Sequence, residues 1–203
     1  MPVVVGTAVQ TLYNIIDTAY VGRIGADALA AISFSFPVFF ILIAINAGLS
    51  TGMTSRIARS LGEKKKKEAE NAALHGLLLS VIVGFLVAGI GIIFLKEIFA
   101  LFGATGNILQ LAVDYTLIIL YGILFMFFSY MFNGIFSAQG DTKTPMKIMV
   151  TTLIINIILD PIFIFALGWG IKGAAIATVI SFFVGLILFL FAIHTKSYLH
   201  IHM

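Results

Sequence analysis

The stretch NIILDPIFIF, residues 156–165, places Asp160 beside Pro161 inside an otherwise apolar run. The surrounding apolar block, 144–167, is long enough to cross a bilayer as a helix, which takes about 20 residues. An acid is costly at such a depth and is a candidate for function by default, because hydrocarbon offers its carboxylate no water. The stretch therefore predicts a membrane-spanning helix that carries a functional acid.

The whole chain has the composition of an integral membrane protein. Of its 203 residues, 61% are hydrophobic and 10% are charged, and the mean hydropathy is +1.12. Soluble domains contain about 25% charged residues, and in lipid a helix satisfies its own backbone hydrogen bonds. The apolar blocks predict an all-α fold of six transmembrane helices with no soluble domain, at approximately 2–21, 28–57, 72–95, 111–138, 144–167 and 173–193.

The basic residues are divided unequally between the two sides that six alternating helices would create. Because cytoplasmic loops are enriched in Lys and Arg, this division predicts a multi-pass protein of the cell membrane with both termini cytoplasmic. The run EKKKK, 63–67, is interpreted as a loop that sets this topology, and a net charge of +3 with this distribution indicates no nucleic-acid partner. The predicted cytoplasmic side holds Arg56, Arg59, Lys64, Lys65, Lys66, Lys67, Lys143, Lys147 and Lys196, and the other side holds Arg23, Lys96 and Lys172.

Two acids and three neutral polar residues reach similar depths in the predicted helices. Asp17 lies roughly 6 Å inside the outer end of the first helix, and Asp160 roughly 10 Å inside the outer end of the fifth. Thr178 in the sixth helix reaches a similar depth. Tyr13 precedes Asp17 by four residues, a spacing that places both on one helix face. Asn156 has the same spacing to Asp160, so all five groups are expected to converge in the outer half of the membrane.

This set of residue types predicts a cation site. No Lys or Arg lies at the depth of the two acids, so a proton or a sodium ion is the expected counter-charge. Tyr, Asn and Thr oxygens can complete the shell of a hard cation or hydrogen-bond a protonated acid. Structural hydrogen bonding between helices is the alternative role for these groups. The absence of cysteine excludes thiol chemistry, and no cofactor or other metal is expected.

The remaining polar residues and Pro161 receive separate interpretations. Pro161 is expected to kink the fifth helix beside the second acid, because proline lacks a backbone donor and its ring crowds the preceding turn. Gln10, Asn46 and Asn133 are candidates for lining a cavity or bridging helices. Asp114 is interpreted as an acid that complements the dipole near the outer start of the fourth helix.

Five segments combine these polar residues with Gly-rich and Pro-containing motifs. They are LYNIIDTAYVGRIGADALAA (12–31), GLSTGMTSRIARSLG (48–62), SAQGDTKTPM (137–146), NIILDPIFIF (156–165) and GIKGAAIATVIS (170–181). Together and in this order they resemble the multidrug and toxic compound extrusion (MATE) family, most closely its prokaryotic, archaeal-like members. The resemblance extends over essentially the whole chain. It implies cation-site roles for Asp17, Asp160, Tyr13, Asn156 and Thr178.

The resemblance also implies an assembly larger than this chain. Family members have two six-helix lobes with the substrate path between them, and this chain corresponds to the N-terminal lobe, with no second copy of LYNIID or LDP. A second six-helix lobe or a homodimer partner is therefore expected, surrounded by membrane lipids. The predicted function is antiport of a proton or sodium ion against an amphipathic, often cationic, small molecule.

Three other functions remain open from the sequence. A lipid flippase of related architecture and an inactive remnant lobe would share the same helices. An intramembrane aspartyl protease would also need two acids that share a proton. The acids occur here as NIID and IILD, without the Tyr-Asp and Gly-x-Gly-Asp signatures of those proteases, so no enzymatic activity is predicted.

Overall fold

The computed structural model describes the backbone of residues 2–196 and, within it, the side chains of residues 11–13 and 15–195. This part of the chain is helical and contains no strand, so the predicted all-α fold is confirmed. The helices are α1 Pro2–Gly22, α2 Ala26–Gly62, α3 Lys66–Leu101, α4 Gly106–Tyr121, α5 Ile123–Ala138, α6 Lys143–Pro161, the π-helix η1 Ile162–Ala166, and α7 Gly170–Lys196.

Several of these helices can cross a membrane. α2, α3, α6 with η1, and α7 are each long and apolar enough to do so, and α4 and α5 together can form a fifth span. α1 has 21 residues, but the side chains of its first half lie outside the described set. Six spans, with the first at 2–21, therefore stay a prediction.

The structure divides the predicted fourth helix, 111–138, into α4 and α5, which are bent by 52° relative to each other. Gly122 lies at the junction, where its N–H bonds to the carbonyl oxygens of both Ile118 and Ile119. A Cβ at Gly122 would lie 2.5 Å from Val179 Cγ1, so α7 approaches the junction too closely for any side chain. The bend arises at a glycine in close contact rather than at a proline.

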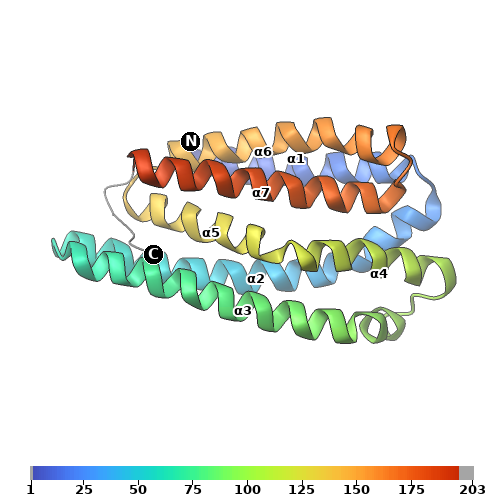
Figure 1. Ribbon diagram of the computed structural model, residues 1–203, viewed down its shortest axis with the longest axis horizontal. Coiled ribbons are helices and arrows are strands. Elements are labelled where there is room, and N and C mark those ends of the chain that lie inside the picture. The colour runs from blue at the N-terminus through green and yellow to red at the C-terminus, as the bar shows by residue number, and fades with distance from the viewer. Residues whose placement is uncertain (1, 197–203) are drawn as a thin grey trace.

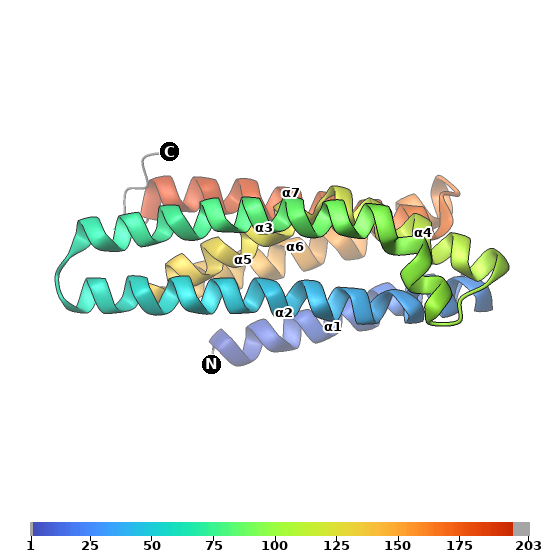
Figure 2. The same cartoon turned by 90° about the horizontal axis from the view of Figure 1, so that it is seen from below.

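The hairpin of α2 and α3 is longer than its apolar blocks, 28–57 and 72–95. Lys, Arg and Glu are good helix formers, so both helices continue into the charged segment between them. Lys64 adopts a left-handed conformation at the turn, with φ 58°. α2 has 37 residues and is about 55 Å long, whereas the hydrocarbon core of a bilayer is about 30 Å thick. The hairpin consequently projects beyond the other helices (Figures 1 and 2).

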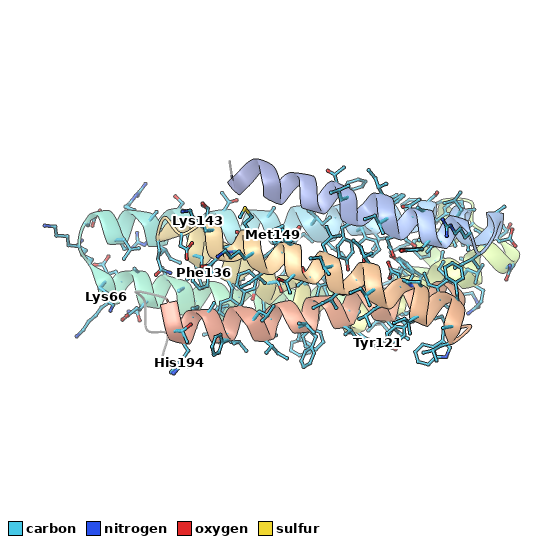
Figure 3. All side chains as sticks on the ribbon, turned by 90° about the horizontal axis from the view of Figure 1, so that it is seen from above. Lys66, Tyr121, Phe136, Lys143, Met149 and His194 are labelled. Atoms are coloured by element: carbon cyan, nitrogen blue, oxygen red, sulfur yellow. The ribbon has the colours of Figure 1, made fainter. Side chains whose placement is uncertain are left out.

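The helices pack in two groups with α5 between them. α1, α6 and α7 lie together on one side, and α2 and α3 lie on the other (Figure 1). Figure 3 shows Lys66, Lys143 and His194 toward the end of the bundle from which the hairpin projects, with Tyr121 in the opposite half. Large apolar side chains such as Phe40, 68% exposed, cover the outside, as expected for a surface that contacts lipid.

Candidate functional site

The five residues predicted to form a cation site lie on three helices of one group. Tyr13 and Asp17 are on α1, Asn156 and Asp160 on α6, and Thr178 on α7. α1 packs against α6, and α6 against α7, so the residues approach one another from three directions. Asp17 is 8% exposed and Asp160 is 0% exposed, and both acids therefore lie inside the bundle.

The hydroxyl group of Tyr13 interacts with groups on all three helices of this cluster. It is close to the hydroxyl groups of Thr178 and Ser181 on α7, and both acids interact with it electrostatically. Asp17 and Asp160 also interact with each other across the contact of α1 with α6. The Tyr13 ring is stacked on Phe182, with the ring centroids 6.2 Å apart, and this contact fixes the direction of the hydroxyl.

Two hydrogen bonds hold the carboxyl groups in place. Asn156 Nδ2 donates to Asp160 Oδ1 at 3.2 Å, across one turn of α6. Tyr115 Oη donates to Asp17 Oδ2 at 3.1 Å and so brings α4 into the cluster. The sequence interpretation did not include Tyr115. The same depth argument that selected Asp17 would have selected Tyr115 if it had also been applied to the tyrosines of the predicted fourth helix.

Each of the five predicted residues has one buried oxygen atom that forms no hydrogen bond of good geometry in the described part of the protein, although the hydroxyl groups of Tyr13 and Thr178 lie close to each other. These atoms are Tyr13 Oη, Asp17 Oδ1, Asn156 Oδ1, Asp160 Oδ2 and Thr178 Oγ1. A buried polar atom left unpaired costs about 1–3 kcal/mol, and this concentration makes the cluster the candidate functional site. The atoms are all oxygens, the ligand type that hard cations prefer.

The two acids of the cluster have no basic partner among the described residues. Among the ion pairs of the described residues, none joins Asp17 or Asp160 to a Lys or Arg. No three His, Asp or Glu side chains in that part of the chain group into a metal site. A cation bound at this cluster would therefore have two carboxylates and neutral oxygens as ligands.

The backbone next to Asp160 departs from a regular α-helix. α6 ends at Pro161, and η1 follows with a bond from Leu167 N to Ile162 O at 2.9 Å. A Cβ at Gly173 of α7 would lie 2.6 Å from the backbone oxygen of Phe163, so α7 packs directly on the η1 backbone. Short π-helices are frequent at functional sites because they change the direction of adjacent side chains.

The other polar candidates lie on three different helices. Gln10 is on α1, outside the residues whose side chains are described. Asn46 on α2 is 0% exposed, and both atoms of its amide group are without a partner in the described protein. Asn133 on α5 is half-buried, and its Nδ2 lies 3.5 Å from Met149 Sδ. None of these contacts tests a cavity-lining role.

Asp114 requires a different interpretation from the one based on sequence. α4 begins at Gly106, so Asp114 lies beyond the first turn and is too far along the helix to act as a dipole partner. Its carboxylate instead forms an ion pair with Lys172 Nζ at 3.1 Å and accepts a hydrogen bond from Gln110. The acid therefore links α4 to the start of α7, next to the residue that contacts Asp17.

Comparison with known proteins identifies the family. The MatE family model matches residues 2–162. The chain belongs to the MatE family. It is 34% identical to the FAD transporter of Shewanella oneidensis, over 92% of this chain and 42% of that protein. It is 32% identical to the probable multidrug resistance protein YoeA of Bacillus subtilis, over 89% of this chain and 40% of that protein.

Solved structures of MatE proteins have the same fold. A crystal structure of MATE in the bent conformation superposes with a TM-score of 0.95 at 38% identity, over 100% of this chain and 46% of that one. A MOP superfamily transporter from Pyrococcus furiosus, described as having a binding pocket of reverse polarity, gives a TM-score of 0.93 at 38% identity, over 100% of this chain and 45% of that one. The chain thus spans less than half the length of these relatives. These relatives are transporters and not enzymes, so the hypothesis of an intramembrane protease is removed. The chain is a multi-pass membrane protein.

Proposed function

We propose that this chain is the N-terminal, cation-coupling lobe of a multidrug exporter in the cell membrane. The supporting observation is the convergence of five unpaired buried oxygens from α1, α6 and α7 in a member of a transporter family. A proton or a sodium ion would bind between Asp17 and Asp160 and supply the interaction partner that these oxygens lack. The predominance of basic residues on one side supports cytoplasmic termini.

The coupling mechanism follows from the two acids lying on different helices. With no cation bound, two ionised carboxylates repel each other and favour separation of α1 from α6. A bound cation attracts both and draws Asp17 on α1 toward Asp160 on α6. A ligand shifts a conformational equilibrium only by its difference in affinity between the two states, and this charge pair supplies such a difference. Movement of α1 would then lower the affinity for substrate and favour outward release.

The substrate in this proposal is an amphipathic, often cationic, small molecule. The relative YoeA is named as a probable multidrug resistance protein, which supports this class. The Shewanella relative is named as an FAD transporter, and FAD carries negative phosphates. The two substrate classes therefore differ in charge, and a transport assay with one dye of each kind separates them.

A complete transport path would require a second body. Alternating access in secondary transporters takes place by rocking of two repeats around a site between them. The relatives are more than twice as long as the part that this chain matches. We therefore assign the second body to another six-helix lobe or to a second copy of this chain, within a shell of membrane lipids.

The experiment joins this chain to the part of YoeA that it does not match and expresses the fusion in bacteria that lack their own exporters. The wild-type fusion is expected to lower accumulation of ethidium and not of FAD. Asp17→Asn and Asp160→Asn should each abolish this effect at unchanged expression. Asp27→Asn is the matched control, because Asp27 is an exposed acid at the start of α2. Undiminished export by both acid variants would refute the coupling role.

A further inference from the structure

A groove between α2 and α3 lies on helices that carry none of the acid cluster. Its volume is about 600 Å³, and its lining residues belong to the halves of α2 and α3 nearer the turn that joins them. Figure 2 shows this turn at the projecting end of the hairpin. One part of the lining is apolar and flat, with Gly48, Gly52 and Leu79. The other part is polar, with Arg56 and Glu68. The groove therefore suits an amphiphilic ligand, which has one polar part and one apolar part.

The two glycines leave room along the α2 surface. A Cβ at Gly48 or at Gly52 would have no atom within 4 Å, so neither position is filled by a neighbouring helix. On the α3 side, Leu79 of the lining is 47% exposed, so the groove opens to the surroundings there. The apolar part of the groove is thus continuous with a surface suited to contact with hydrocarbon.

The position of Arg56 along α2 matches the headgroup layer. Arg56 follows the first residue of α2, Ala26, by about 30 residues, which corresponds to roughly 45 Å of helix. A bilayer including its headgroups is about 40–45 Å thick. If α2 begins at one surface, Arg56 reaches the headgroups of the other, and Gly52 and Gly48 lie about 6 and 12 Å deeper in the membrane.

The charge around the groove favours an anion. Between residues 56 and 70 there are six Lys and Arg residues and three Glu residues, a difference of +3. Arg56 and Glu68 form only a long ion pair of 3.9 Å, with both side chains about half exposed. Glu68 also lies 3.6 Å from Lys65 Nζ. Arg56 can therefore turn to another anion while Glu68 keeps a cationic partner.

We propose that this groove binds one anionic phospholipid, with the lipid phosphate on Arg56 and one acyl chain along Gly48 and Gly52 toward Leu79. The phosphate accepts hydrogen bonds from the guanidinium group, which presents its donors in a fork that fits phosphate. The acyl chain covers the glycine surface that no helix covers. Basic groups at a membrane surface favour anionic over neutral lipids, so the site distinguishes lipids by charge.

The experiment uses the purified chain in mild detergent with added phosphatidylglycerol or phosphatidylcholine. Bound lipids are counted by native mass measurement, and thermal unfolding is followed by the fluorescence of Trp169. One phosphatidylglycerol should be retained per chain and should raise the unfolding temperature more than phosphatidylcholine does. Arg56→Gln should weaken this binding about tenfold, as for the loss of one charge-assisted contact. Gly52→Leu should abolish it by filling the groove.

The control variant is Arg59→Gln, which removes the same charge from the same helix outside the groove. Equal losses of phosphatidylglycerol binding in Arg59→Gln and Arg56→Gln would show that binding depends on surface charge alone, and would refute the site. Equal retention of both lipids, or equal stabilisation by inorganic phosphate, would also refute it. A lipid-free dimer that Gly52→Leu dissociates would assign the groove to a second copy of the chain and overturn the proposal.

Discussion

Gly173→Ala should destabilise the protein by pushing α7 away from η1. The added Cβ would lie 2.6 Å from the carbonyl carbon and oxygen of Phe163, where ordinary contacts begin at 3.4 Å, so the backbones must separate by several tenths of an ångström. Overpacking of this kind costs about 1–3 kcal/mol, and a rigid backbone favours the upper part of that range. Alanine regains about 1 kcal/mol of helix propensity over glycine. The expected net loss is about 1–2 kcal/mol.

The matched control for this prediction is Gly89→Ala, a helical glycine of α3 with no atom within 4 Å of an added Cβ. It should gain up to about 1 kcal/mol, so the two variants should differ by roughly 1–3 kcal/mol. The assay is thermal unfolding in detergent, followed by fluorescence of Trp169. This residue is the only tryptophan of the chain and lies 5.4 Å from the Phe163 ring. Equal stability of the two variants would refute the close approach of α7 to η1.

Two further predictions concern Tyr115 and Gly122. Tyr115→Phe removes the hydrogen-bond donor to Asp17, and a hydrogen bond to a charged group is worth about 1.5–3 kcal/mol. The unfolding temperature should fall by a corresponding amount without added cation and should recover in acid or sodium. An unchanged unfolding temperature would contradict the hydrogen bond. Gly122→Ala places a Cβ 2.5 Å from Val179 Cγ1 and should cost about 1–3 kcal/mol, most of which Val179→Ala should restore in the double variant. Additive losses in that cycle would show that the two residues are not in contact.

Much of the site could be predicted because depth and helix face are readable from a membrane sequence. The apolar blocks gave the ends of α1, of α6 with η1, and of α7 to within three residues, whereas α2 and α3 extend up to six residues beyond their blocks and the fourth block divides into α4 and α5. The spacing of four placed Asn156 on the same face as Asp160. The structure brings all five predicted residues to one cluster. It also ends α6 at Pro161, where proline removes a backbone donor. These features depend on local geometry along a single helix.

Other features depend on contacts between helices and were not predictable in the same way. The depth of Tyr115 in its helix could be read from the sequence, but its hydrogen bond to Asp17 depends on how α4 is placed relative to α1. The bend at Gly122 arises from the approach of Val179 on α7, which a glycine in an apolar run does not reveal. Asp114 was assigned to a helix start because α4 begins five residues before its apolar block does. Sequence periodicity indicates faces and depths, but not which neighbour each face meets.

Cation binding to the purified chain tests the proposed role of Asp17 and Asp160. Retention of radioactive sodium at alkaline pH and uptake of protons on acidification are recorded for the wild type, Asp17→Asn, Asp160→Asn and the control Asp27→Asn. The wild type is expected either to retain one sodium ion per chain that both cluster variants lose, or to take up about one more proton per chain on mild acidification than either cluster variant, and the control should match the wild type. Sodium retention and proton uptake that match the wild type in both Asp17→Asn and Asp160→Asn would contradict this role.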